Sequence, residues 1–297
     1  MKKISNPIIY FGTDKLSAQP LTRLLEAGFP VEAVVTKPDT IKGRGRQMVA
    51  PDVKVIGEEY GIKVLQPSKL SEITPFLSQL NRPLGVLVSF GKIVPQDIID
   101  LFPKGIINIH PSLLPKYRGP SPIETVILNG DSSTGATLMK LTAKMDAGPV
   151  FAQKEIALSG SETKNELYER LACLGSDMLI NHLPDIADGS LQAEPQDDTK
   201  ATYCQKLDKS MASLDVVKNT TTWLLRQIRA FAGFPKSKLE LLGLDCTITA
   251  AHTASHPGSA LDQKCKDGLY LIIDRLVPPG SNEMTAQDFL NGHSTSG

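Results

Sequence analysis

Asn108 and His110 stand two positions apart at the end of GIINIH (105–110), an apolar run that predicts a buried strand. Successive side chains of a strand point to opposite faces, so this pair projects to one face. Ligands of open α/β sheets bind beyond the carboxyl ends of the strands. A polar pair at this end is therefore a candidate reaction centre, in which the imidazole would move protons near neutral pH.

Asp146 is the third candidate for this centre. It lies 36 residues beyond His110, between two predicted strands, where Gly148 and Pro149 predict a turn. A carboxylate beside His110 would stabilise the imidazolium and order water. Each of these residues also has ordinary structural uses, such as capping or a core hydrogen bond, so their spacing alone assigns no reaction.

The loop after His110 carries three prolines, Pro111, Pro115 and Pro120. Proline locks φ and lowers the entropy that is lost when a loop becomes ordered. The sequence therefore predicts a preformed loop that could serve as a ligand wall.

Apolar runs that alternate with helix signals predict an α/β fold to position these residues. Six runs rich in Val, Ile and Leu predict a parallel sheet, and a seventh strand is expected at 149–158. The six runs are 7–12, 31–36, 62–66, 85–91, 105–110 and 134–141. The expected helix signals are Pro51 as a start with Gly61 as a stop, a capping box from Ser121 to Glu124 with a stop at Gly130, and a capping box of Thr163 and Glu166.

A second domain is expected near the carboxyl end. Residues 189–205 lose apolar periodicity and gather Asp, Pro, Gly and Thr, which is typical of a linker. A helix over 213–231 and short strands at 237–243, 245–251 and 268–274 predict a small β-barrel. The expected organisation is a catalytic domain over 1–188, a linker over 189–205 and a β-barrel domain over 206–297.

Composition limits the possible functions. The chain of 297 residues balances 32 Lys and Arg against 32 Asp and Glu, so a nucleic-acid role must depend on a local patch. Its four cysteines form no C-x-x-C pair, and no apolar run reaches the length of a membrane span. The segment after the first strand lacks G-x-G-x-x-G, which disfavours a dinucleotide. A cytoplasmic protein with reduced cysteines is expected.

The run NIHPSLLPKYRG (108–119), followed at the right interval by Asp146-Ala147-Gly148, closely resembles the folate-dependent formyltransferases. The resemblance is greatest to the members that act on methionyl-initiator tRNA, and it covers nearly the whole chain. It implies a Rossmann-like amino-terminal domain with a parallel or mixed sheet, and a smaller β-barrel (OB-like) carboxyl-terminal domain. The chain departs from the family pattern in FGTD, in Gly85, and in Ala232-Gly233-Phe234.

The resemblance also implies roles for individual residues. Asn108 would donate a hydrogen bond to a developing oxyanion, His110 would handle the proton or polarise the carbonyl, and Asp146 would bias His110 and hold a water. The co-substrate would be 10-formyltetrahydrofolate, with no metal and no covalent nucleophile. Its expected contacts are Ser112, Leu113, Leu114, Pro115, Phe90, Gly91 and Ile93. A cis Leu114-Pro115 bond is expected, and a core role for Phe90 is the alternative.

Residues 37–54 form a basic loop in which five cations oppose two carboxylates, which leaves a local charge of +3. A generic charge run of this kind is a solvated surface loop. The resemblance instead implies that Lys42, Arg44 and Arg46 contact initiator methionyl-tRNA, and that the protein acts as a monomer. Two alternatives remain open at this point: a formyltransferase for an amino sugar nucleotide, and a noncatalytic small-molecule-binding module.

Overall fold

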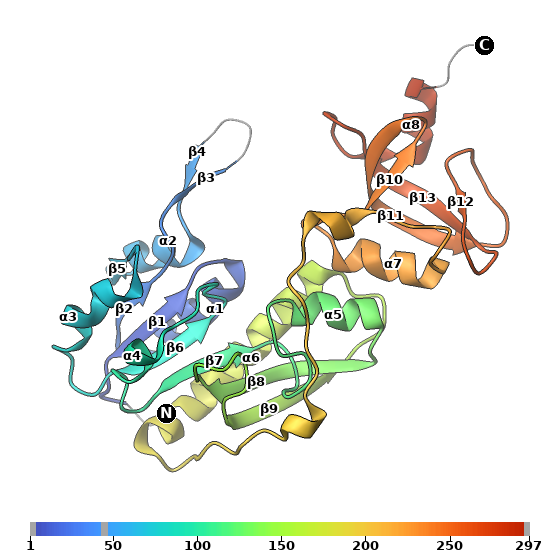
Figure 1. Cartoon of the computed structure of the whole chain (residues 1–297). Helices are drawn as coiled ribbons and strands as arrows, with labels where there is room; N and C mark the ends of the chain where they lie inside the picture. Colours follow the sequence, from blue (N-terminus) through green and yellow to red (C-terminus); the bar gives the residue numbers. More distant parts are fainter. Residues whose placement is uncertain (1–3, 43–46, 294–297) are drawn as a thin grey trace. The chain divides into compact units, whose positions relative to one another are not determined.

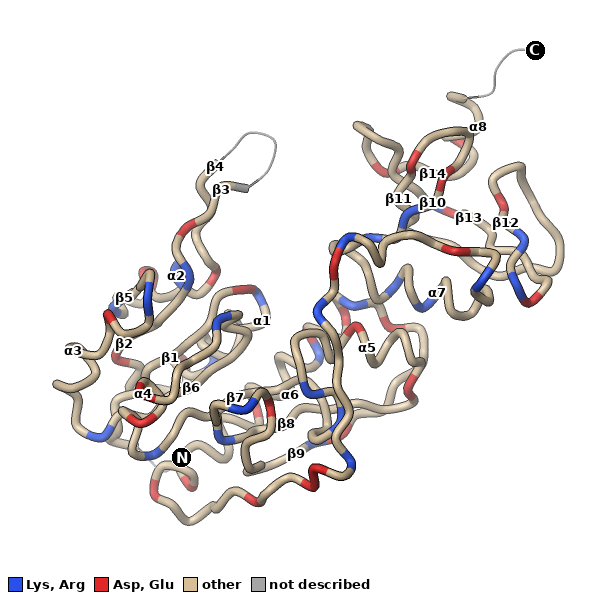
Figure 2. Tube along the Cα trace, in the orientation of Figure 1, with Lys and Arg blue, Asp and Glu red and all other residues tan. Residues whose placement is uncertain are grey.

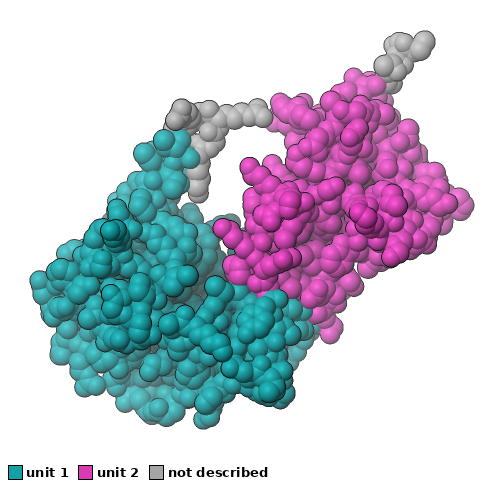
Figure 3. All heavy atoms as spheres, in the orientation of Figure 1, with its two compact units in different colours: residues 1–119, 133–157, 168–203 teal, residues 120–132, 158–167, 204–297 magenta. Residues whose placement is uncertain are grey.

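The computed structural model describes residues 4–42 and 47–293. The chain divides into two compact units (Figure 3). The first unit consists of residues 1–119, 133–157 and 168–203, and the second of residues 120–132, 158–167 and 204–297.

A seven-stranded sheet forms the first unit (Figure 1). In spatial order its strands are β5 (Lys63–Leu65), β2 (Val31–Val35), β1 (Ile8–Gly12), β6 (Leu84–Val88), β7 (Ile106–His110), β8 (Ser133–Lys140) and β9 (Val150–Ala157). The first five strands are parallel, as the sequence predicts.

The prediction that residues 134–141 continue the parallel sheet is wrong, because β8 pairs with β7, and β9 with β8, in antiparallel register. The chain returns to the sheet beyond its carboxyl edge, so His110 at the end of β7 pairs with Thr137 in the middle of β8. Apolar runs report burial on both faces, which parallel and antiparallel strands share. The sequence pattern therefore could not give the strand direction.

Helices cover both faces of this sheet. Three of them, α1 (Lys15–Glu26), α2 (Asp52–Glu59) and α6 (Lys164–Asp188), lie on one face. The short helices η1 (Leu70–Ile73), α3 (Thr74–Leu77) and α4 (Gln96–Ile99) pack on the other face, where their apolar side chains join a core with Phe11, Val35 and Ile106. A Cβ atom on Gly175 of α6 would lie 2.5 Å from Ile109 Cγ2, so Ile109 points toward α6. Asn108 and His110 therefore share the opposite face, as predicted.

Helix ends follow the predicted signals in part. Helix α2 begins at Asp52 after Pro51, and Gly61 follows its end with a φ of 66°. The Thr163 and Glu166 capping box is confirmed, because each residue's backbone N–H donates to the other's side chain. The Ser121 capping box is wrong. The Ser121 hydroxyl donates instead to the Gln205 carbonyl, although α5 (Pro122–Asn129) does end at Gly130 in a left-handed conformation.

The second unit is an antiparallel half-barrel that packs against one helix. Its strands are β10 (Lys238–Leu241), β11 (Leu244–Ala254), β12 (Gln263–Lys264), β13 (Tyr270–Val277) and β14 (Met284–Thr285), followed by α8 (Ala286–His293). The helix predicted over 213–231 is shorter: α7 spans Thr221–Ala230, because the Thr220 hydroxyl caps its first turn. Residue Asp215 closes a separate turn upstream.

Three shorter features complete the described chain. Strands β3 (Thr40–Lys42) and β4 (Gln47–Val49) form a two-stranded antiparallel pair. Two short helices, η2 (Asp198–Lys200) and η3 (Lys209–Ala212), lie between α6 and α7. Within the described residues, no helix is long and apolar enough to span a membrane.

Candidate active site

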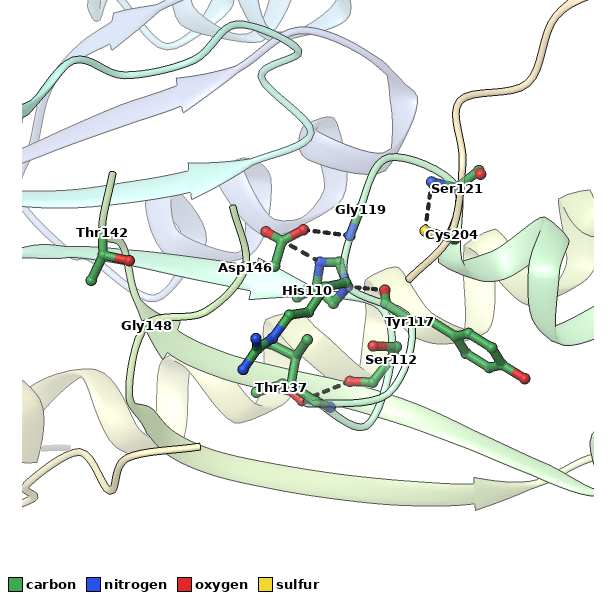
Figure 4. Close-up of polar contacts among 12 residues, drawn as sticks. His110, Ser112, Tyr117, Gly119, Ser121, Thr137, Thr142, Asp146, Gly148 and Cys204 are labelled. Carbon is green, nitrogen blue, oxygen red and sulfur yellow. Dashed lines mark hydrogen bonds and ion pairs between the residues drawn. The ribbon is translucent and has the colours of Figure 1, made fainter. Parts of the chain in front are cut away.

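The structure brings His110 and Asp146 together at the carboxyl edge of the sheet (Figure 4). His110 Nδ1 lies 3.8 Å from Asp146 Oδ1, and the side chains are 6% and 15% exposed. This distance is too long for a direct hydrogen bond but close enough for a charge interaction in a partly buried site. Asp146 is therefore placed to stabilise a protonated His110.

The other ring nitrogen of His110 fixes the tautomer. His110 Nε2 lies 3.0 Å from the Tyr117 carbonyl oxygen. A carbonyl can only accept a hydrogen bond, so Nε2 must carry a proton. In the neutral ring, Nδ1 then holds the free lone pair, on the side that faces Asp146.

Asn108 lies two residues before His110 on the same face of β7 and is 6% exposed. Among the residues that the structure describes, none forms a hydrogen bond with its side-chain amide. A nearly buried amide costs free energy unless it finds a partner. Its N–H groups are thus available to a ligand, as the oxyanion role requires.

The Asp146 loop has an unusual backbone. Asp146 itself has a φ of 47°, and its Oδ2 accepts a hydrogen bond of 2.8 Å from the Gly119 N–H. A Cβ atom on Gly148 would lie 1.8 Å from the Lys140 carbonyl oxygen, so only glycine permits this turn. Left-handed backbone at a residue other than glycine is strained, and such strain is concentrated at functional sites.

The loop of Ser112, Leu113, Leu114 and Pro115 is held mainly by its own hydrogen bonds and by β8. The Thr137 hydroxyl donates to the Ser112 carbonyl and accepts from the Leu114 N–H, at 2.6 and 3.2 Å. The Ser112 hydroxyl donates to the Lys116 carbonyl. The Leu114-Pro115 bond is cis, as expected from the resemblance. Hydrogen bonds within the protein thus fix the course of this loop.

The segment expected to line the pterin departs from its predicted form. Strand β6 ends at Val88, and the chain then turns through Ser89 and Gly91, both with positive φ. The Phe90 side chain is 1% exposed and packs edge-on against Phe11, so the structure shows the core role that the sequence left open as the alternative for this ring. Only the backbone of Phe90 can face a ligand. Ile93, in contrast, is 78% exposed.

Gly91 lies next to the side chain of Lys37. A Cβ atom at this position would be 2.4 Å from Lys37 Nζ, the mobile end of a long side chain, and the φ of 66° at Gly91 is what favours glycine here. Asp14 follows the end of β1 at the same edge of the sheet. Its carboxylate accepts a hydrogen bond of 2.5 Å from the Ser89 hydroxyl. Burial raises the pKa of the Asp14 carboxyl, although the hydrogen bonds from Ser89 and the backbone oppose this effect.

The basic loop is anchored at its base. Asp39 accepts hydrogen bonds from Lys54 Nζ at 2.8 Å and from Gln66 Nε2 at 2.7 Å. These bonds lower the pKa of Asp39 and keep its carboxylate charged. Of the predicted tRNA contacts, Lys42 ends β3, whereas Arg44 and Arg46 lie outside the described residues. Along the rest of the described chain, cationic and anionic residues alternate without long runs of one sign (Figure 2).

Sequence reasoning missed four residues that support the site: Arg118, Thr137, Gln153 and Gln196. Gln153 Nε2 donates to the Leu114 carbonyl and to the Thr137 hydroxyl. Arg118 lies within the recognised motif, but its partners are distant in sequence, so no local pattern marks them. Across residues 4–42 and 47–293, no cluster of three or more His, Cys, Asp or Glu side chains could hold a metal ion.

Comparison with known proteins agrees with this geometry. Residues 7–183 match the formyl transferase family, and residues 206–294 match the formyl transferase carboxyl-terminal domain. The chain belongs to the formyl transferase family. Among its relatives, the methionyl-tRNA formyltransferase of Methylococcus capsulatus is 38% identical over 98% of both chains. That of Geobacter metallireducens is 37% identical over 96% of this chain and 95% of its own.

Solved structures of the family share the fold. An N-formyltransferase from Helicobacter canadensis, in complex with folinic acid and dTDP-3-aminofucose, has a TM-score of 0.69 at 20% identity and covers 90% of this chain and 98% of its own. HypX from Aquifex aeolicus, in complex with tetrahydrofolic acid, has a TM-score of 0.67 at 16% identity over 98% of this chain and 48% of its own. At these identities the likeness establishes the fold alone.

Proposed function

We propose that this protein transfers the formyl group of 10-formyltetrahydrofolate to the amino group of methionyl-initiator tRNA, which yields formylmethionyl-tRNA for translation initiation. One observation carries the proposal: relatives named methionyl-tRNA formyltransferase are 35–38% identical over at least 96% of this chain. The convergence of His110 and Asp146 beside Asn108 supports it.

In the proposed reaction, the methionyl amine attacks the formyl carbon, the bond from that carbon to N10 of the folate breaks, and one amine proton is in effect transferred to N10. Asn108 would donate an amide N–H to the oxygen of the tetrahedral intermediate. His110 Nδ1 would take the amine proton and pass it on, because Nε2 is occupied by Tyr117. The Asp146 carboxylate would stabilise the imidazolium in between.

The remaining parts of the chain receive roles in the same proposal. The folate would lie against the Ser112, Leu113, Leu114 and Pro115 loop and the backbone of Phe90, Gly91 and Ile93. Lys42, Arg44 and Arg46 would contact the acceptor stem. Residues 1–188 would form the catalytic domain, residues 189–205 the linker and residues 206–297 a tRNA-binding domain. We propose that the protein acts as a monomer in the cytoplasm.

A substrate comparison tests this function. The purified chain is incubated with 10-formyltetrahydrofolate and either methionyl-initiator tRNA or a dTDP-linked amino sugar, and formylated product is measured by mass spectrometry. We expect formyl on methionyl-tRNA and none on the sugar nucleotide. Formylation of the sugar alone would establish the alternative enzyme, and formylation of neither would favour the noncatalytic binding module.

A further inference from the structure

The segment 194–203 is bonded to both loops of the candidate active site, and its Gln196 lies where the two are joined. We propose that Gln196 is a positioning residue for the His110 and Asp146 pair. The inference rests on the proposed formyl transfer, because that reaction gives the pair its task.

Three consecutive residues, Tyr117 to Gly119, hold both members of the pair. The Tyr117 carbonyl accepts from His110 Nε2 at 3.0 Å, and the Gly119 N–H donates to Asp146 Oδ2 at 2.8 Å (Figure 4). Any shift of this short backbone stretch moves the imidazole and the carboxylate together. The distance between them depends in addition on the backbone of Asp146 itself.

The side chain of the middle residue, Arg118, points to Gln196. Arg118 is 1% exposed, and its Nε and Nη2 donate to Gln196 Oε1 at 3.1 and 2.8 Å. Nη2 also donates to Asp198 Oδ1 at 2.6 Å. Burial opposes the charge on this guanidinium, but the bond to Asp198 raises the pKa of Arg118 above its ordinary value, so it stays a cation.

The other end of the Gln196 amide holds the Asp146 loop. Gln196 Nε2 donates to the carbonyl oxygens of Asp146 and Gly148, at 2.8 and 2.7 Å. The guanidinium can only donate and the two carbonyls can only accept, so the orientation of the amide is fixed by chemistry. Gln196 thus holds the turn in which Asp146 adopts its positive φ of 47°.

The backbone of the same segment is tied to both sides of the site. The Arg118 N–H donates to the Thr202 carbonyl at 2.8 Å, and the Tyr117 N–H donates to the Thr202 hydroxyl at 2.9 Å. Glu194 and Val150 exchange two backbone hydrogen bonds of 2.7 and 2.8 Å just beyond the Asp146 turn. Because both ends of the segment are fixed, Gln196 is held in one place. Loss of the two hydrogen bonds that Gln196 Nε2 donates would free the Asp146 turn.

Two substitutions distinguish the acceptor and donor functions of the Gln196 side-chain amide. Gln196→Glu keeps an acceptor for Arg118 but removes both donors to the Asp146 turn, whereas Gln196→Met removes donors and acceptor. The matched control is Gln192→Met, because Gln192 lies just before this segment and its Nε2 donates to the nearby Gly189 carbonyl, away from the site. All variants are assayed as full chains for kcat and KM, the pH profile of kcat, thermal stability and the 15N shifts of the His110 ring.

We expect kcat to fall on the order of 10- to 100-fold in both Gln196 variants, because small misplacements of reacting groups have effects of this size. The KM for 10-formyltetrahydrofolate should stay near the wild-type value, and the pH profile and the His110 15N shifts should change. Gln196→Glu should melt near the wild-type temperature, since Arg118 keeps its partner. Gln192→Met should match the wild type in every measurement.

A wild-type kcat in folded Gln196→Glu would overturn the proposal, and so would a loss no larger than that of Gln192→Met or unchanged His110 15N shifts. The test also separates this inference from the proposed function. If the wild-type chain formylates no methionyl-tRNA, the proposed function fails, whereas the 15N shifts need no substrate and still decide whether Gln196 positions His110.

Discussion

His110 has one ring nitrogen bound to the backbone and one turned toward a carboxylate. In hydrolase triads, one ring nitrogen of the histidine is held by a hydrogen bond and the other transfers the proton, and the two nitrogens of His110 are arranged in a similar way. Here the orienting group is the Tyr117 carbonyl and the charged group is Asp146, on the side of the reactive nitrogen. The carboxylate therefore acts on the charge of the ring and leaves its orientation to the backbone.

This arrangement predicts a single neutral tautomer for His110. With Nε2–H donated to Tyr117, the 15N spectrum of the ring at high pH should show a protonated Nε2 and an unprotonated Nδ1. Long-range 1H–15N correlation spectra of selectively labelled protein make this measurement. His182 on α6 provides an internal reference. A His110 ring protonated mainly on Nδ1 would contradict the geometry.

The sequence predicts the orientation of the Asn108 and His110 side chains but not the orientation of the Phe90 ring. Alternation along a strand places Asn108 and His110 on one face, and the structure agrees. The sequence leaves a ligand-facing role and a core role open for Phe90, and the structure shows the core role, because the chain turns at Ser89 and Gly91 and directs the ring inward. A turn with positive φ at a serine leaves no reliable sequence signal. The partners of Arg118 lie about 80 residues away in the sequence, beyond the reach of local patterns.

At the scale of elements, the five parallel strands and the capping box of α6 follow from local sequence, whereas the direction of β8 and the start of α7 do not. Strand direction depends on which edge of the sheet the connection reaches, and this is a property of the whole loop. The start of α7 depends on one hydroxyl, that of Thr220. Both failures arise because apolar periodicity reports burial but not connectivity or caps.

The basic loop gives a prediction at this scale. Arg44→Ala should lower kcat/KM for methionyl-tRNA about 10- to 100-fold, as loss of a charge-assisted contact would. It should also reduce the salt dependence by a slope of about 0.7–0.9 per lost phosphate contact. Folate binding and thermal stability should not change.

The control for this prediction is Lys104→Ala, because Lys104 precedes β7 at the opposite, amino edge of the sheet. Initial rates at subsaturating tRNA and several salt concentrations make the comparison. Equal rates for wild type and Arg44→Ala would mean that the segment is only a solvated surface loop.

The turn that leads into α6 predicts a pH-dependent contribution to stability. Burial raises the pKa of the Glu162 carboxyl, but hydrogen bonds from the Ser159 and Gly160 N–H groups outweigh it and lower the pKa from 4.5 to about 2. A carboxyl with a lowered folded pKa stabilises the protein above its unfolded pKa, and this is lost as the pH falls.

Glu162→Gln should therefore lower the free energy of unfolding by about 1–2 kcal/mol at pH 7, after allowance for solvent screening. The difference from wild type should shrink as the pH falls from 4.5 toward 2. Urea titrations at several pH values test this, with the exposed Glu155→Gln on β9 as a control. A deficit that stays constant between pH 7 and pH 3 would show that the carboxylate charge does not matter.

In the proposed function, the first unit carries out the chemistry and the second contributes to substrate binding. The residues that bond to His110 and Asp146, from Tyr117 to Gln196, all belong to the first unit. The second unit has its own core, formed by α7, the half-barrel strands and Phe289 of α8. Each unit therefore has the packing it needs for a separate task.

A folate analogue should therefore act on the first unit alone. We expect it to slow hydrogen exchange at the amides of Ser112 to Leu114 and of Phe90 to Ile93, because these segments would lose access to solvent. Residues beyond 205 should exchange at an unchanged rate. Mass spectrometry of peptic fragments with and without the analogue makes the measurement. Protection confined to residues beyond 205 would place the folate in the other unit.

The proposed roles of Asn108 and His110 are tested most directly by the single-turnover rate of formyl transfer to methionyl-initiator tRNA in Asn108→Ala and His110→Ala. Asn181→Ala and His182→Ala on α6 serve as matched controls. We expect the rate to fall about 10²–10³-fold without the oxyanion donor and about 10²–10⁴-fold without the imidazole. The affinity for a folate analogue should stay near that of wild type, and both controls should transfer formyl normally. A near-wild-type rate in either active-site variant would mean that these two side chains do not carry the reaction.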